Sequence, residues 1–162
     1  MKKLLIFLSL VLSMSVAFSQ TEQQQQNQEQ EEITLTIDQL NDDSWMDSYF
    51  LTKRFNFVPV LKKYKNQLGL TDEQLKAINR FYSKYYSKMV ELARSIREKE
   101  DQLNDLVLNG GDAKKIRDLI VEIAKEKAEL TVYNIKEVRT IQNALTKEQF
   151  EKLKNLAEQS VI

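Results

Sequence analysis

The sequence predicts an all-α fold, built as a long antiparallel helical hairpin with short flanking helices. Two stretches, residues 72–108 and 113–144, carry apolar residues at spacings of three and four, which is the pattern of an amphipathic helix. An Asn-Gly-Gly turn at residues 109–111 separates them, so the two helices are expected to run antiparallel. Because such a hairpin has little core for its length, we also expect it to bury its remaining apolar side against a second copy.

Residues 1–19 have the features of a cleavable secretion signal, with a retained anchor as the alternative. Lys2 and Lys3 precede an apolar run that is too short for a membrane span, and residues 17–19 form a small-x-small cleavage site. The chain contains no cysteine, which leaves no disulfide and no lipid attachment point at the cleavage site. We therefore expect a protein exported to the bacterial periplasm.

Residues 20–47 are expected to form an acidic, Gln-rich, disordered leader. They carry eight acidic side chains and no lysine or arginine, whereas residues 48–162 hold 22 basic and 16 acidic side chains. A polar, low-complexity segment buries too little apolar surface to offset the entropy that it loses on ordering. The leader either solvates the chain or folds back on the basic remainder, where it would compete with an acidic or unfolded partner.

The segment before the first predicted helix is the hardest to interpret. Residues 35–39 read Leu-Thr-Ile-Asp-Gln, but the polar run at residues 41–44 would stop a helix within two turns, so we treat this helix-start pattern as a coincidence. An aromatic cluster follows, which would either pack on the hairpin as core or contact a partner. Its members are Trp45, Tyr49, Phe50, Phe55 and Phe57.

Short helices are expected beside the hairpin, within a helical domain that covers residues 48–162. One is predicted over residues 59–68, because Pro59 suits the first turn of a helix and Gly69 suits the position just after its end. The other begins after Thr146 and closes the chain.

The two long helices differ in the quality of their apolar stripes. The helix over residues 72–108 has a heptad pattern and would be roughly 55 Å long at 1.5 Å per residue, so it needs a partner along its side. The stripe of the second long helix includes Ile120 and Ile135, but its register slips near residues 131–133.

A five-residue pattern, L-T-x-x-Q, stands at the start of two predicted helices, at residues 70–74 and 145–149. In each copy the threonine hydroxyl can accept from the N–H of the glutamine, while the glutamine side chain reaches back to the threonine N–H, which is a capping box. The leucine holds the position of a hydrophobic staple. The residues expected to shape these helix ends are Leu70, Thr71, Gln74, Leu145, Thr146 and Gln149.

The composition argues against catalysis. The chain has no histidine and no cysteine, which removes the usual proton shuttle and the common zinc and copper ligands. Carboxylates such as Glu122, Glu126 and Glu129 could form a weak oxygen site for a hard cation, although such residues usually lie on a solvated face. We expect no enzyme, no cofactor and no metal site, and the secretion signal argues against a nucleic-acid partner.

Two L-T-x-x-Q motifs around a helical hairpin, behind a secretion signal, make residues 59–157 similar to the Spy/CpxP family of periplasmic proteins. The resemblance implies a thin, cradle-shaped antiparallel dimer and an ATP-independent chaperone that limits the aggregation of unfolded envelope proteins. Alternatives are an inhibitor of an envelope-stress sensor kinase, or a metal-resistance or metal-sensing protein, although the relatives that bind metal use the His or Cys absent here. A Skp-like trimeric porin chaperone is a further alternative.

Basic and apolar side chains together are the expected contacts of such a chaperone with its clients. Basic residues attract unfolded chains over long range, and exposed apolar residues then hold them. The candidates lie in the aromatic cluster and on the first long helix. They are Lys53, Arg54, Phe55, Phe57, Lys84, Lys88, Arg94 and Arg97.

Overall fold

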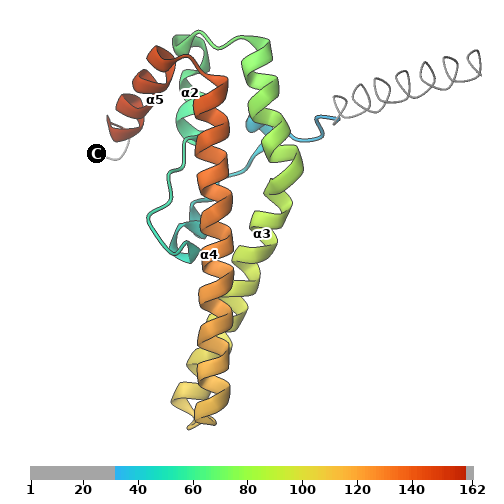
Figure 1. Ribbon diagram of the computed structural model, residues 1–162, viewed down its shortest axis with the longest axis vertical. Helices are drawn as coiled ribbons and strands as arrows, with labels where there is room; N and C mark the ends of the chain where they lie inside the picture. Colours follow the sequence, from blue (N-terminus) through green and yellow to red (C-terminus); the bar gives the residue numbers. More distant parts are fainter. Residues whose placement is uncertain (1–31, 160–162) are drawn as a thin grey trace, which may run out of the picture. The chain divides into compact units, whose positions relative to one another are not determined.

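The computed structural model describes residues 32–159, so the predicted secretion signal and residues 20–31 of the predicted leader lie outside the described residues. The described part contains helices and no strand, which confirms the all-α prediction (Figure 1). None of its helices is both long enough and apolar enough to cross a membrane. In chain order the elements are the 3-10 helices η1 (Ile37–Gln39) and η2 (Ser44–Tyr49), then α2 (Val58–Leu68), α3 (Asp72–Leu108), α4 (Ala113–Ala144) and α5 (Lys147–Gln159).

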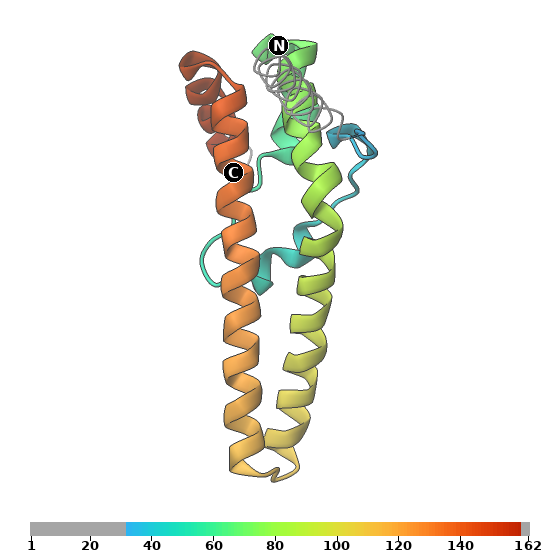
Figure 2. The same cartoon turned by 45° about the vertical axis from the view of Figure 1, so that its right-hand side comes forward.

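Helices α3 and α4 lie side by side and antiparallel, and they form the predicted hairpin (Figure 2). The turn between them requires Gly110, whose φ is 69°, and Gly111, where a Cβ atom would lie 2.9 Å from the carbonyl oxygen of Leu106. Asp112 then caps α4 by accepting from the N–H of Lys115 at 3.0 Å. Both long helices have the predicted bounds, because periodicity and caps agree there.

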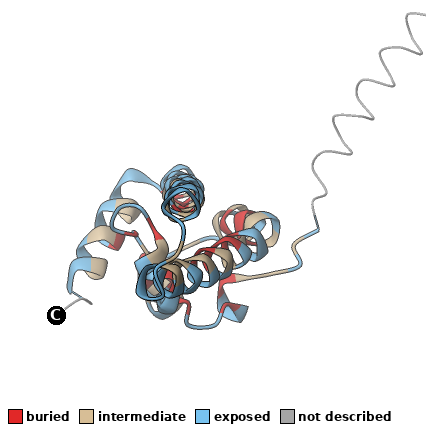
Figure 3. Cartoon of the chain, turned by 90° about the horizontal axis from the view of Figure 1, so that it is seen from below, coloured by how far each residue is buried: buried red, intermediate tan, exposed pale blue. Residues whose placement is uncertain are grey.

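Burial follows the sides of the long helices that face other elements, as Figure 3 shows. On α4 this side differs from the predicted stripe. Asn134 and Glu137 take the inward positions that follow Leu130, whereas Ile120 and Ile135 are 49% and 48% exposed. The placement of Ile120 and Ile135 in the apolar stripe is therefore wrong, and two polar side chains face inward just after the register slip that the sequence shows near residues 131–133.

The short helices α2 and α5 pack against each other (Figure 1). The rings of Phe57 and Phe150 meet edge to face with their centroids 6.0 Å apart, and Leu61 and Leu153 are fully buried. Gly69 ends α2 in the left-handed conformation, with φ of 63°. The turns before α3 and before α5 are thereby brought to the same end of the hairpin.

Residues 33–57, which we call the strap, precede α2 and pack against the hairpin. Both 3-10 helices of the strap contact α3, and η1 also contacts α2. The prediction of a disordered leader is therefore wrong for residues 33–47, because large apolar side chains between the polar residues bury enough surface to offset the entropy cost of ordering. The strap contributes to the core with Ile37, Leu40, Met46, Phe50 and Phe57.

Candidate functional site

The two L-T-x-x-Q motifs have the same local geometry. At the start of α3 the N–H of Gln74 donates to Oγ1 of Thr71 at 3.3 Å, and the N–H of Thr71 donates to Oε1 of Gln74 at 3.0 Å. At the start of α5 the corresponding distances between Gln149 and Thr146 are 3.2 and 2.9 Å. Each motif is thus a reciprocal capping box that supplies partners for otherwise unpaired backbone groups.

The two glutamines also meet each other, although 75 residues separate them along the chain. Nε2 of Gln74 donates to Oε1 of Gln149 at 2.8 Å and to the carbonyl oxygen of Ala144 at 3.0 Å. Nε2 of Gln149 donates to the carbonyl oxygens of Leu68 and Gly69 at 3.2 and 3.1 Å. Each glutamine therefore caps its own helix. It also donates a hydrogen bond to a carbonyl oxygen at the C-terminal end of the helix that precedes the other motif. We call this arrangement the glutamine clasp.

The leucines of the motifs pack into or against the hydrophobic core. Leu145 is buried in the core, and Leu70 is partly buried against it. Because Thr71, Gln74, Thr146 and Gln149 are engaged in caps and in the clasp, the motif residues hold the two turns together, and nothing in their contacts points to a ligand.

The third sequence copy, at residues 35–39, also forms a turn with a capping contact. The N–H of Thr36 donates to Oε1 of Gln39 at 2.8 Å, and the helix that follows is only the three-residue η1. The strap backbone then docks on α3, since the N–H of Ile37 donates to Oδ1 of Asn79 at 2.9 Å and the N–H of Leu35 donates to Oγ of Ser83 at 3.0 Å. This copy fixes the strap, so it is more than a coincidence of sequence.

A buried ion pair between Arg54 and Asp43 fixes the C-terminal half of the strap. Arg54 donates from Nη2 to Oδ2 of Asp43 at 2.7 Å and from Nη1 to Oδ1 of Asp47 at 3.1 Å. Asn56 donates to the other carboxylate oxygen of Asp43 at 3.0 Å. Burial alone would lower the pKa of Arg54, but the hydrogen bond and charge of Asp43 raise it overall. Arg54, a candidate client contact, instead lies in the interior and is only 7% exposed.

A second polar group joins the strap to both long helices. The hydroxyl of Tyr82 on α3 donates to Oε1 of Glu137 on α4 at 2.7 Å, and Asn134 donates to Oε2 of Glu137 at 3.1 Å. Asn134 also pairs with the backbone of Phe55, through its N–H and its carbonyl oxygen, each at 2.9 Å. Burial raises the pKa of Glu137, although the charge of Arg54 and the hydrogen bonds from Tyr82 and Asn134 lower it in part.

The other candidate client contacts divide between surface and core. Phe57 is buried against Phe150 between α2 and α5, so it is not accessible to a client. Phe55 is 58% exposed and Lys53 is also exposed. The four basic candidates of α3 are exposed along that helix, and the guanidinium of one lies 5.8 Å from the Trp45 ring. These four are Lys84, Lys88, Arg94 and Arg97, of which Arg97 makes the contact with Trp45.

Large apolar side chains are exposed in three places of the described structure, and sequence reasoning named few of them. The strap exposes some beside α3 and α4, the hairpin tip exposes others, and α4 exposes a third group, of which Ile120 and Ile135 belong to its predicted stripe. They are Trp45, Leu51, Phe55, Val107, Leu108, Ile120, Val121, Val132 and Ile135. The slip of register in α4 was the sequence signal that could have identified Val132 and Ile135 as exposed.

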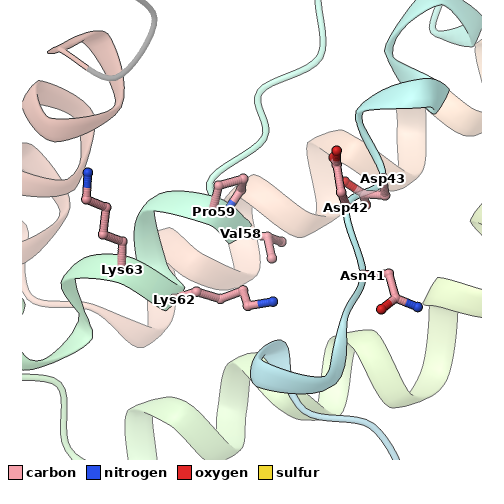
Figure 4. Close-up of a pocket in the computed structure, with 7 residues that line it drawn as sticks. All are labelled: Asn41, Asp42, Asp43, Val58, Pro59, Lys62 and Lys63. Carbon is pink, nitrogen blue, oxygen red and sulfur yellow. The ribbon is translucent and has the colours of Figure 1, made fainter.

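A groove of about 470 Å³ lies between the strap and α2 (Figure 4). Asp42 and Asp43 line one side, Lys62 and Lys63 line the other, and Val58 and Pro59 lie between them. Its charges are largely engaged within the chain, because Asp43 is paired with Arg54 and Lys62 donates to the carbonyl oxygen of Leu40 at 2.8 Å. Within residues 32–159 no three potential ligands among His, Cys, Asp and Glu cluster as a metal site would require.

Comparison with known proteins gives one match. A protein-family model described as LTXXQ motif family protein matches residues 59–157. These residues include both capping motifs, the whole hairpin and most of α5. No curated protein and no solved structure matches the chain. The whole strap, residues 33–57, precedes the matched region.

Proposed function

Because the chain belongs to the LTXXQ motif family, which is the Spy/CpxP-type family, we propose that it is an exported, ATP-independent chaperone. It would bind unfolded proteins in the periplasm and limit their aggregation under envelope stress. The proposal requires no nucleotide and no cofactor, since capture and release can both be equilibrium events.

The observation that carries this proposal is the set of large apolar side chains left exposed beside basic ones. Phe55 and Leu51 are 58% and 59% exposed on the strap, next to the exposed Lys53. Apolar groups exposed in clusters mark interaction surfaces, and basic groups raise the local concentration of acidic chains. A surface of this composition suits many clients better than one specific partner.

A homodimer is part of the proposal. Ile120 and Val121 of α4 are 49% and 46% exposed in the single chain. Contact with a second copy would remove such surface from water, as the dimers of small helical proteins commonly do.

The proposal is tested by following the aggregation of a heat-unfolded or reduced client in the presence of the purified protein. Suppression at stoichiometric amounts, with several unrelated clients, is the expected result. If no client is protected even at low salt, the chaperone proposal is wrong. Pull-down from an envelope extract is the companion measurement, because one dominant partner in place of many clients would instead indicate an inhibitor of a sensor kinase.

A further inference from the structure

The strap and α4 together form a surface that neither would form alone. The N–H of Leu51 donates to Oγ1 of Thr131 at 2.9 Å, and the backbone of Phe55 pairs with the side chain of Asn134. These bonds hold the loop between η2 and α2 along one side of α4, where it is visible in Figure 1. The side chains of Leu51 and Phe55 nevertheless remain more than half exposed.

Two apolar side chains of α4 are exposed next in sequence to the residues that hold this loop. Val132 and Ile135 are three residues apart, so they lie on one side of the helix, one position beyond the two residues that anchor the loop. They are 49% and 48% exposed. We call Leu51, Phe55, Val132 and Ile135 the strap patch.

The charged residues around the strap patch are mainly basic. Lys53 in the loop and Arg139 on α4 are exposed, whereas the ammonium of Lys136 lies over the Tyr85 ring of α3, 5.5 Å from its centroid. The exposed carboxylate on this part of α4 is Glu129. An apolar centre with a predominantly positive rim is complementary to a chain segment that carries apolar and acidic side chains together.

We propose that the strap patch is the site where this protein captures extended, acidic segments with apolar side chains. This inference rests on the proposed chaperone function and names the client chemistry and the place of contact. Leu51, Lys53 and Phe55 precede the region that matches the family model, so this part of the site belongs to this chain's own strap.

A second copy of the chain fits this patch less well than an acidic segment does. In a two-fold contact through the patch, Lys53 and Arg139 would lie close to the same residues of the other copy. Like charges brought together at an interface cost free energy, whereas an acidic segment would neutralise them. The rim therefore favours a client over self-association at this position.

The first experiment measures the binding of three fluorescein-labelled peptides to the purified protein by anisotropy. One peptide combines acidic and apolar residues, one has lysine in place of each acidic residue, and one has serine in place of each apolar residue. The acidic, apolar peptide should bind most tightly. The double variant Phe55→Ser/Ile135→Ser should bind it at least about fivefold more weakly, as expected when interface anchors are truncated.

Two further variants keep the test independent of folding. Val107→Ser/Leu108→Ser removes equally exposed apolar side chains from the hairpin tip and should leave peptide affinity within about twofold of the original, like other surface changes away from the contact. Lys53→Glu leaves the apolar residues in place and should weaken the acidic peptide while favouring the lysine peptide. If the patch and tip variants bind the acidic peptide equally well, the site assignment is wrong.

The outcomes separate this proposal from the proposed function. Aggregation suppressed by the wild type and by Phe55→Ser/Ile135→Ser alike would overturn the strap patch and leave the chaperone function standing. Peptide binding at the patch without any suppression of aggregation would overturn the function. If the double variant changes the solution mass from dimer to monomer and leaves peptide affinity unchanged, the patch is an interface between copies and the proposal fails.

Discussion

At the scale of single residues, Gln74 and Gln149 each combine three tasks in one side chain. Oε1 accepts from the N–H of the capping threonine, and Nε2 donates both to the other glutamine and to a carbonyl oxygen at the end of a neighbouring helix. The spacing of the motif predicts the first task, because a capping box is local. The other two depend on the tertiary fold, so nothing in a five-residue pattern could reveal them.

Gln149→Ala should therefore destabilise the protein by more than the loss of a surface cap. It removes the partner of the Thr146 N–H and the donor to Leu68 and Gly69, and we expect a cost of about 1–3 kcal/mol in the free energy of unfolding. Gln39→Ala is the matched control, because Gln39 accepts only from its own capping threonine; its cost should stay below about 1 kcal/mol. Urea unfolding measures both, and equal losses would contradict the clasp.

The raised pKa of Glu137 leads to a second prediction, which concerns how the stability of the protein depends on pH. Its carboxyl binds a proton more tightly in the folded protein than in the unfolded chain, because burial disfavours its charge. Its contribution to stability is therefore complete below the unfolded pKa, about 4.3, and is lost as pH rises through the higher folded value. The stability of the wild type relative to Glu137→Gln should fall as pH increases through this window. Urea unfolding at several pH values measures it, and a difference that grows with pH would contradict the assignment.

At the scale of elements, periodicity predicted the helices well and the strap not at all. Residues 72–108 and 113–144 have both a 3.6-residue pattern and clear caps, so their bounds could be predicted. The strap buries Ile37, Leu40 and Met46 at spacings that fit neither a long helix nor a strand, and it folds through short 3-10 turns. Its anchors are side-chain contacts to residues 30 or more positions away, such as Asn79 and Ser83, which no local pattern encodes.

The same element explains the polar positions of α4. Asn134 and Glu137 face inward because the strap brings the backbone of Phe55 and the charge of Arg54 to them. The sequence shows only a slip of the apolar stripe at this point. With the strap in place, position 134 requires a polar side chain, because an apolar residue there would leave the backbone N–H and carbonyl of Phe55 without partners.

Met46→Ala tests whether the strap is part of the folded unit. Met46 is fully buried, and truncating such a side chain removes its transfer free energy and leaves a cavity, at a cost of about 2–5 kcal/mol. Leu108→Ala is the control, because Leu108 is 83% exposed and should change stability by less than about 0.5 kcal/mol. Thermal or urea unfolding gives both values. Two equally small effects would show that the strap does not belong to the cooperative core.

At the scale of the whole molecule, the formal net charge of zero conceals an acidic segment at residues 20–47 and a basic remainder at residues 48–162. Acidic side chains of the strap neutralise part of the basic domain from within, through Asp43 with Arg54 and Asp38 with Lys65, whose Nζ lies 2.7 Å from the carboxylate. The four basic client-contact candidates of α3 and the basic rim of the strap patch remain exposed on the surface. In the proposed function, long-range attraction of acidic clients would depend on these exposed cations, and apolar contacts would hold the client after encounter.

The dependence of client capture on salt follows from this division. The distance over which charges act falls from about 30 Å at 0.01 M salt to about 3 Å at 1 M, so added salt should slow the association of an acidic unfolded client. Apolar contacts are not screened, and a bound client should dissociate at a rate that changes much less. Stopped-flow association with one acidic and one basic client of similar length measures the effect. The basic client should not lose association rate as salt is added; if both clients slow to the same extent, the exposed basic residues do not steer capture.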